Sequence, residues 1–416
     1  MIGSPSLAEV LDHLRQQDHL AVFDLGAAWT VVTWAEAPAT IDAAPDWITA
    51  ARAALQPRPP QPLLPFSGGL VGWLGYEAGR FTERMPPPRA DPPAATLRLW
   101  RCEGGLCLHH PTGEWHIGGT PDFTARARAL LDQPTTPLRP AAKAPGAPLS
   151  PEPHEAARYQ QGVREILSAI RAGDVYQACL AWEQRGVPIT DPTARWLDLR
   201  EANPAEQGAL LRSGAHTVIS NSPELYLSVS PEGRLRSVPI KGTARVDEGD
   251  AGRQRLWTSE KERAELTMIV DLVRNDLGRV AATGSVRAAD RQLRRCGDLL
   301  HAEQAVTAIL REGADAFDAV AASFPPGSVT GAPKVAAMQL IAALEPGPRG
   351  VYTGAIGFFG DDGAAHLSVA IRTATVTDGL ARFHIGAGIV ADSQPALEWE
   401  ETLAKGRALA AWLGAR

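Results

Sequence analysis

The segment GAIGFFGDDGAAHLSVAIRTATVTDGLARFHI, residues 354–385, decides how this chain folds. It contains strand-like runs at Gly354–Phe359, His366–Thr375 and Ala381–Ile385, and no helical pattern separates them. A doubly wound parallel sheet requires helices that alternate with its strands. The segment therefore predicts an α+β protein in which sheets and helices form layers.

Helical patterns lie on both sides of this segment. Apolar residues recur on one face from Glu155 to Ala172 and again from Ser259 to about Leu277. A last helix is expected from about Pro395 to Leu413. The chain before residue 133 offers short β-like pieces instead, at residues 20–25, 30–34, 97–101 and 115–117.

The stretch Gln133–Pro153, QPTTPLRPAAKAPGAPLSPEP, separates two parts of the chain. It is dense in proline and poor in apolar side chains, which is typical of an extended linker. We expect an amino-terminal accessory half at residues 1–132, a Pro-rich linker at 133–153 and a catalytic region at 154–416.

Composition excludes several classes of partner. Of 416 residues, 41 are Lys or Arg and 47 are Asp or Glu, a net charge of −6 that argues against nucleic acid as a partner. No apolar run approaches the roughly 18 residues that cross a bilayer. The amino terminus lacks a signal-like pattern, and the four cysteines form no CxxC pair. We expect a cytoplasmic protein with reduced cysteines and no membrane contact.

Two Glu-x-x-Glu pairs are candidate metal ligands. Glu262 and Glu265 lie in one predicted helix, Glu398 and Glu401 lie in the last, and a spacing of three places each pair on one helical face. If the pairs converged, their repulsion would require a cation, and Mg²⁺ prefers such oxygen ligands. The same pattern is common on solvated helices.

Three isolated side chains each have more than one interpretation. Lys241, in a strand end followed by a fixed loop, is a nucleophile, an anion partner or an exposed loop residue. Burial is expected to disfavour its charged form. Arg372 interrupts a strand-like run as a carboxylate anchor or a surface residue. His301 falls on a predicted helix, where a lone histidine is more often structural.

Glycine-rich connections offer backbone amides. Gly386 and Gly388 follow a predicted strand without the GxGxxG spacing, and their amides either cradle a carboxylate or form a tight connection. The loop 325–334, PPGSVTGAPK, opens onto a helix but lacks the spacing of a nucleotide-binding loop. No cysteine lies in a nucleophile context, so a built-in glutaminase is not expected.

Taken together and in order, several strings resemble the chorismate-utilising enzyme family. They are PIKGT at 239–243, ELTMIVDLVRNDLGR at 265–279, PPGSVTGAPK at 325–334, GAGIVADS at 386–393 and EWEETLAKGRAL at 398–409. The resemblance covers essentially all of 155–413, and FSGGLVGWLGYEAGR at 66–80 is similar to the family's accessory half. It implies two packed antiparallel sheets with helices outside and the active site between the sheets.

Within the family, the resemblance is to the aminodeoxychorismate synthase branch. The similar anthranilate synthases usually have alanine where this chain has Lys241. Isochorismate and salicylate synthases place a lysine, which activates water, where this chain has Gln177. An amide cannot act as that base, so both residues favour amination over hydration.

The resemblance also implies roles for the candidate residues. Mg²⁺ at Glu265 and Glu401, with Glu262 and Glu398 directly or through water, binds the ring carboxylate of chorismate. Lys241 attacks C2 of the ring, and ammonia from a separate glutamine amidotransferase subunit then enters at C4. The product, 4-amino-4-deoxychorismate, leads to para-aminobenzoate and folate. Glu224 is the general acid, and Thr243 and His301 occupy two further catalytic positions. The substrate-binding groups are Tyr352, Arg372, Lys405, Gly386, Gly388 and Gln177.

Three alternatives remain open, one of which is a generic magnesium-dependent lyase that releases pyruvate. Anthranilate synthase activity uses the same substrate and ammonia but gives another product. A regulatory or assembly subunit would keep the fold without catalysis. The absence of a Leu-Leu-Glu-Ser motif from the amino-terminal part makes tryptophan feedback doubtful.

Overall fold

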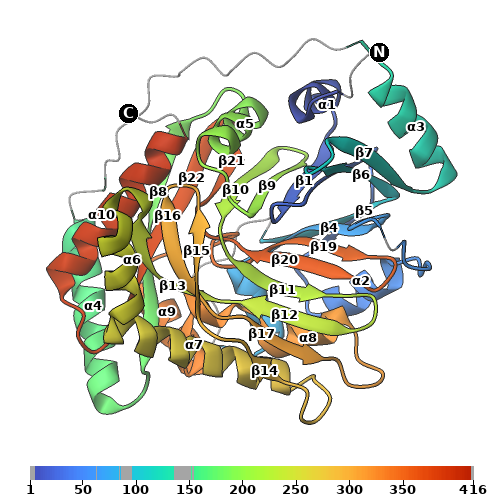
Figure 1. Ribbon diagram of the computed structural model, residues 1–416. Coiled ribbons are helices and arrows are strands. Elements are labelled where there is room, and N and C mark those ends of the chain that lie inside the picture. The colour runs from blue at the N-terminus through green and yellow to red at the C-terminus, as the bar shows by residue number, and fades with distance from the viewer. Residues whose placement is uncertain are drawn as a thin grey trace.

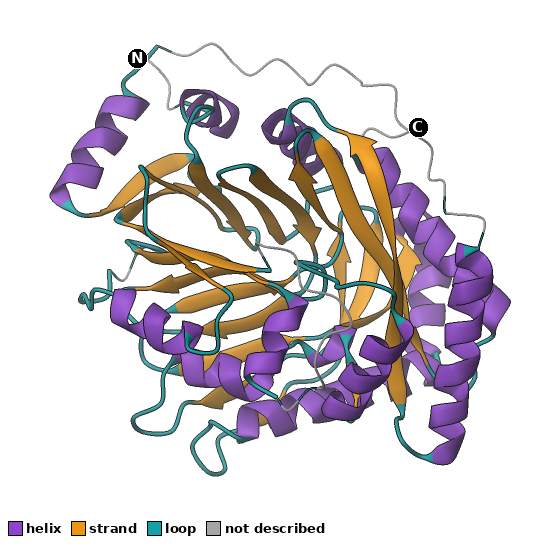
Figure 2. Cartoon of the chain, turned by 180° about the vertical axis from the view of Figure 1, so that it is seen from behind, coloured by secondary structure: helices purple, strands orange, loops and turns teal. Residues whose placement is uncertain are grey.

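The computed structural model describes residues 5–61, 63–83, 85, 96–134, 151 and 154–413. Two large antiparallel sheets pack face to face, and helices cover their outer faces (Figures 1 and 2). The expected α+β class with two packed sheets is therefore confirmed. Most of the predicted linker, residues 133–153, lies outside the described residues.

The first sheet has ten strands among the described residues, and all of its pairings are antiparallel. Its order is β18 (Gly331–Ala332), β8 (Gln177–Pro188), β22 (Leu380–Ile389), β21 (Thr373–Thr377), β10 (His216–Ser222), β9 (Gln207–Ser213), β1 (His19–Leu25), β2 (Trp29–Ala35), β6 (Gly104–His109) and β7 (Glu114–Gly119).

The second sheet has nine strands in the described part of the chain. Its order is β14 (Arg287–Ala288), β17 (Val306–Ile309), β12 (Arg234–Val238), β11 (Leu225–Val229), β20 (Ala365–Val369), β19 (Ala355–Gly360), β4 (Gly69–Leu74), β5 (Leu97–Cys102) and β3 (Thr40–Asp42). A small sheet that the sequence did not predict joins β13 (Ile240–Arg245), β16 (Leu299–Glu303) and β15 (Gln292–Cys296).

Helices lie outside the sheets or close their ends (Figure 1). They are α1 (Leu7–His13), α2 (Trp47–Ala54), α3 (Pro121–Leu131), α4 (Glu155–Ala172), α5 (Pro192–Ala202), α6 (Gly249–Thr258), α7 (Glu260–Gly278), α8 (Ala316–Ser323), α9 (Lys334–Leu344) and α10 (Pro395–Trp412). Short 3₁₀ turns are η1 (Tyr76–Phe81), η2 (Val246–Glu248) and η3 (Gly327–Val329).

The amino-terminal strands belong to the same sheets as the later ones. β1 pairs with β9 in the first sheet, and β4 pairs with β19 in the second. In the glycine-rich segment at 66–80, a Cβ on Gly72 would lie 1.9 Å from the carbonyl oxygen of Arg98. Only glycine permits this backbone approach, so residues before 133 are built into the frame that carries the site.

The alternating direction of side chains along the strands explains why the protein has separate core layers. In β1, Leu20 and Val22 face the helices on the outer side, whereas Ala21 and Phe23 lie between the two sheets. Because successive side chains point to opposite faces of a strand, a strand covered on both sides buries both sets. The sheet-to-sheet layer is thus a separate core from the helix-to-sheet layers.

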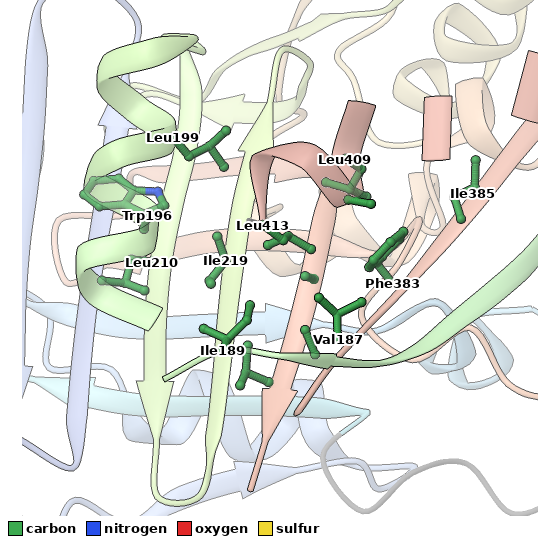
Figure 3. Packing of buried hydrophobic residues seen from close by; sticks show 14 of the residues in the cluster. Val187, Ile189, Trp196, Leu199, Leu210, Ile219, Phe383, Ile385, Leu409 and Leu413 are labelled. Carbon is green, nitrogen blue, oxygen red and sulfur yellow. The ribbon is translucent and has the colours of Figure 1, made fainter. Parts of the chain in front are cut away.

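The outer layer of the first sheet is seen in Figure 3. Trp196 and Leu199 of α5, and Leu409 of α10, pack with the strand residues Ile219 and Phe383 in one buried cluster. Burial of such side chains contributes roughly 1.5–3 kcal/mol each. This layer fixes α10 against the sheet, and α10 carries one of the Glu-x-x-Glu pairs.

Three local predictions were wrong. The run His366–Thr375 is two strands, β20 and β21, because Arg372 between them adopts a φ of +50° that breaks the ladder. Lys241 lies in strand β13 rather than in a loop, since β13 pairs with β16. His301 lies in β16 rather than on a helix, directly opposite Thr243.

Candidate functional site

A cavity of about 330 Å³ lies where the small sheet and α10 meet β8 and β22 of the first sheet. We call it the central cavity. Eight of the residues proposed from the sequence line it, namely Glu224, Lys241, Thr243, His301, Tyr352, Arg372, Gly386 and Lys405. They come from segments more than 180 residues apart in the chain, which the two sheets and the small sheet bring together.

Three polar lining residues were missed. Ser328 lies within the string PPGSVTGAPK and Cys179 lies two residues after Gln177, but no pattern marked their side chains as functional. His384 lies within β22 and gave no signal beyond strand alternation. Its ring stacks on that of Tyr352, with centroids 5.3 Å apart and planes 13° apart.

Gln177 and Gly388 border the cavity at Lys241. A Cβ on Gly388 would lie 2.7 Å from Nε2 of Gln177 and 3.0 Å from Nζ of Lys241. Gly388 is therefore required for this close approach. Gln177 is fully buried, and its Oε1 has no hydrogen-bond partner among the described residues.

Glu224 is a buried carboxyl group in the wall of the cavity. It follows β10, and its Oε1 accepts a hydrogen bond of 2.5 Å from Oγ of Ser328. Burial raises the pKa of Glu224 to about 7, although Ser328 and Lys241 act in the opposite direction. A carboxyl group that keeps its proton near neutral pH is suited to general acid catalysis.

Lys241 is held by a carboxylate. Its Nζ lies 3.3 Å from Oε2 of Glu265. Burial alone would lower the pKa of Lys241, but the Cys179 sulfur and the Glu265 carboxylate raise it above its ordinary value. Burial therefore disfavours the charged amine as expected, but the neighbouring groups together outweigh it, so the net pKa shift of Lys241 is upward.

Thr243, His301 and Arg372 form a hydrogen-bonded chain. Nη2 of Arg372 lies 3.4 Å from Nε2 of His301, and Nδ1 of His301 lies 3.2 Å from Oγ1 of Thr243. Burial and the charge of Arg372 lower the pKa of His301 to about 4, so the ring is neutral. Since Arg372 can only donate, Nε2 of His301 accepts, and Nδ1 carries the proton toward Thr243.

Tyr352 and Lys405 both lie close to Gly386. A Cβ on Gly386 would lie 2.9 Å from the Tyr352 hydroxyl oxygen. Nζ of Lys405 donates to the Gly386 carbonyl oxygen at 3.3 Å and pairs with Oε1 of Glu401 at 2.6 Å. Burial raises the pKa of Tyr352, so its hydroxyl keeps its proton and can donate to an anion.

The four metal-ligand candidates lie on α7 and α10 as predicted, and they influence one another. Burial and the neighbouring charge of Glu265 raise the pKa of Glu262, to which Glu401 also contributes. Burial and Glu401 likewise raise the pKa of Glu398. Burial would raise the pKa of Glu401 too, but its pairing with Lys405 lowers it.

This donor set fits magnesium by its chemistry. It consists of carboxylate oxygens with mutual repulsion that a cation relieves. Two of the carboxylates are paired with Lys241 and Lys405, with which a cation would compete. Within the described ranges, no three His, Cys, Asp or Glu side chains already form a metal-binding group.

The lysine of the PPGSVTGAPK loop serves another purpose. Lys334 is buried, and its Nζ pairs with Oδ2 of Asp276 at 2.7 Å and donates to the carbonyl oxygen of Ser323. It therefore joins α9 to α7 and α8 and does not line the cavity.

No helix in the described part of the chain has both the length and the apolar character to cross a bilayer.

Comparisons with known proteins identify the family of this chain. The family described as chorismate binding enzyme matches residues 13–411. The anthranilate synthase component 1 of Streptomyces coelicolor is 38% identical over 375 residues, covering 83% of this chain and 73% of that protein. The aminodeoxychorismate synthase of Streptomyces griseus is 38% identical over 376 residues, covering 86% of this chain but 52% of that protein, so this chain spans about half its length.

A solved structure has the same architecture. The anthranilate synthase component I of Streptococcus pneumoniae superposes with a TM-score of 0.80 at 27% identity, covering 92% of each chain. The family match spans nearly the whole chain and includes every residue that lines the central cavity. This protein is therefore an enzyme of the chorismate-binding family.

Proposed function

We propose that this protein is the chorismate-aminating component of an aminodeoxychorismate synthase. It would convert chorismate and ammonia into 4-amino-4-deoxychorismate and water. The observation that carries the proposal is the position of Lys241, whose amine lies in the cavity wall beside Glu265 and Gly388. The relatives include both anthranilate and aminodeoxychorismate synthases, so the proposal depends on this residue and on Gln177 rather than on overall identity.

The cavity suits a small dianion. Its volume of about 330 Å³ lies at the lower end of the range of roughly 300–1,000 Å³ for small-molecule sites. Arg372 and Lys405 supply positive charge, and the Tyr352 hydroxyl is a neutral donor. We assign to these groups the binding of the chorismate carboxylates and the orientation of the enolpyruvyl group, since charge-assisted hydrogen bonds are the stronger ones.

Glu224 is assigned as the general acid. Its pKa of about 7 leaves much of it protonated at neutral pH. It would give its proton to the C4 hydroxyl of chorismate, which departs as water when the C4–O bond breaks. Ser328, which donates to Glu224, then stabilises the carboxylate that forms.

Lys241 is assigned as the nucleophile. Its neutral amine forms a bond to C2 of the ring while the double bonds shift and the C4–O bond breaks. Ammonia then bonds to C4, the double bonds shift back, and the C2–N bond breaks to return the amine. Because the pKa of Lys241 is raised in the ligand-free protein, the amine must first lose a proton. Thr243 and His301, which lie next to it in the small sheet, are assigned to the catalytic group with the neutral ring as a hydrogen-bonding partner.

Magnesium is assigned to the carboxylates of α7 and α10. Glu265 and Glu401 would hold it, together with Glu262 and Glu398 directly or through water. The ion would neutralise the ring carboxylate of chorismate. The contribution of the chain's own residues is to present four carboxylates from two helices that the core fixes in place.

We assign the supply of ammonia to a separate glutamine amidotransferase subunit. The product, 4-amino-4-deoxychorismate, would lead to para-aminobenzoate and folate. The test is incubation of the purified chain with chorismate, Mg²⁺ and ammonium, followed by chromatographic identification of the product. The proposal requires 4-amino-4-deoxychorismate. Anthranilate would instead assign the chain to the other branch, and no consumption of chorismate would indicate a regulatory or assembly subunit.

A further inference from the structure

A carboxylate from the amino-terminal part of the chain binds the loop that carries Tyr352. Glu77 lies in η1, which follows strand β4 of the second sheet. Its Oε1 accepts a hydrogen bond of 2.6 Å from the backbone N–H of Arg349, and its Oε2 accepts one of 3.0 Å from that of Gly350. Both amides belong to the α9–β19 loop, which we define as residues 345–354.

The backbone beside Glu77 holds the same loop. The N–H of Tyr76 donates to the carbonyl oxygen of Gly350 at 2.8 Å, so Gly350 is bound through both of its backbone groups. Gly350 adopts a φ of +62°, which leaves its two backbone groups directed at η1. The contacts with Glu77 and Tyr76 therefore fix one end of the loop to the second sheet.

Arg349 carries this restraint to the cavity. Its buried guanidinium group lies over the Tyr76 ring at 4.6 Å and the Tyr352 ring at 5.8 Å, between the two parts of the chain. It donates to both oxygens of Glu345 and, at 2.8 Å, to the carbonyl oxygen of Cys179 in β8. Stacked rings and charged hydrogen bonds of this kind leave the group one arrangement.

The other end of the loop is held in a strained conformation. Thr353 has a φ of +59°, a region that a β-branched residue rarely adopts. Its N–H donates to the carbonyl oxygen of Ala370 at 2.8 Å, and its Oγ1 donates to the carbonyl oxygen of Tyr352 at 2.6 Å. Such a conformation persists only where the surroundings hold it, and Tyr352 lies between the two restraints.

We infer that Glu77 is a positioning residue for chorismate binding, which acts by fixing the α9–β19 loop so that the Tyr352 hydroxyl points into the central cavity. The inference rests on the substrate-binding role proposed for Tyr352. Burial raises the pKa of Glu77 to about 7, although the N–H groups of Arg349 and Gly350 and the Arg349 charge act in the opposite direction. The ionised form is the one that fits the loop, because both groups that face its two oxygens are N–H donors. Glutamine at this position would direct an NH₂ group at one of those donors and leave it without an acceptor.

The test is the steady-state kinetics of chorismate consumption by Glu77→Gln, measured whatever the product. Measured at about pH 8, where Glu77 with its pKa of about 7 is mostly ionised, the variant is expected to raise KM for chorismate about tenfold, because one hydrogen bond to a charged group is lost. Its kcat should change less than about threefold, since no reacting atom is touched. If Glu77→Gln does not fold, Glu77→Asp, which keeps the charge but has a shorter reach, takes its place with an expected KM rise of about threefold.

Asp361 supplies a matched control. It is a buried carboxylate at the far end of β19 that also holds the amino-terminal part, through the N–H of Gln56 at 2.9 Å and Arg101 at 2.8 Å. Asp361→Asn should lower the melting temperature and leave KM unchanged. A rise in KM for both variants would mean that general loosening of the fold, not positioning, is responsible.

A double-mutant cycle separates action through Tyr352 from other effects. In the Tyr352→Phe background, Glu77→Gln should change KM less than about twofold, because the group it positions is gone. An unchanged KM in the folded single variant, or a full tenfold effect without the hydroxyl, overturns the inference. The proposed function fails separately, if the wild-type protein consumes chorismate to another product.

Discussion

Nζ of Lys241 lies 3.3 Å from Oε2 of Glu265, so the proposed nucleophile is the counterion of a proposed magnesium ligand. The small sheet provides the lysine, and helix α7 provides the glutamate. The next residue, Gly242, lies close to the other α7 glutamate of the set, since a Cβ there would lie 2.7 Å from Oε2 of Glu262. A cation bound at Glu265 would compete with Lys241, so occupancy of the two partners is linked.

Magnesium dependence is tested by Glu401→Gln. Loss of one ionised ligand should lower activity at least about tenfold, a barrier increase of roughly 1.4 kcal/mol. Part of the loss should be recovered at higher Mg²⁺ if the ligand assignment holds. Glu400→Gln, on the exposed face of α10, is the control and should leave activity unchanged. Normal turnover in excess chelator would contradict the assignment.

The pH profile tests Glu224. Below about pH 7, kcat/KM for chorismate at constant free ammonia should rise with pH, because the neutral form of Lys241 becomes more abundant. Above about pH 7 the profile should be level, because the fraction of protonated Glu224 falls with pH by the same factor by which the fraction of neutral Lys241 rises.

Glu224→Gln should lower activity by roughly 10²–10⁴-fold, the usual contribution of a general acid. The break near pH 7 should disappear from its residual profile. A wild-type profile that is level below pH 7 and falls above it would instead mean that Lys241 acts as a cation.

The source of nitrogen is tested with the chain alone. Because no cysteine in the chain has the setting of a glutaminase nucleophile, ammonium salts should support turnover and glutamine should not. Raising the pH at fixed total ammonium should increase the rate through the free ammonia concentration. Efficient use of glutamine by the purified chain would be incompatible with a separate amidotransferase.

The buried Lys334–Asp276 pair is tested by stability. Asp276→Asn leaves a buried ammonium group without its counterion and should lower the free energy of unfolding by about 3–5 kcal/mol. Denaturant titration measures the change. KM for chorismate at a temperature where the variant is folded should remain as in the wild type, because Lys334 does not line the cavity. A large change in KM with little loss of stability would mean that the loop at 325–334 contributes to substrate binding after all.

Sequence periodicity predicted where helices and strands form, but not where a strand is interrupted. The helix Glu155–Ala172 was placed to the residue, because its burial follows the period of 3.6 residues. Arg372 has no breaker signature, yet its positive φ ends a strand and turns its guanidinium toward His301. Such a conformation is imposed by tertiary contacts, which local propensity does not contain.

The candidate site was likewise predictable only in part. The strings around Lys241 and Glu401 marked those residues by type and spacing. Glu77 lies in the string at 66–80, but that string did not predict its role, because the role depends on a loop 272 residues away in the chain. His384 was hidden for the same reason, since it is one residue in a regular strand until Tyr352 stacks on it.

The most direct test of the account is whether Lys241 forms a covalent bond to the ring. Chorismate with Mg²⁺ and without ammonia should leave a transient adduct, detected by intact-protein mass spectrometry after rapid quenching and mapped to residues 239–243. The adduct should increase with pH as the amine loses its proton, and Lys241→Ala should abolish it while the fold is kept. An adduct that survives in Lys241→Ala, or none at any time in an active wild-type preparation, would contradict the nucleophilic role.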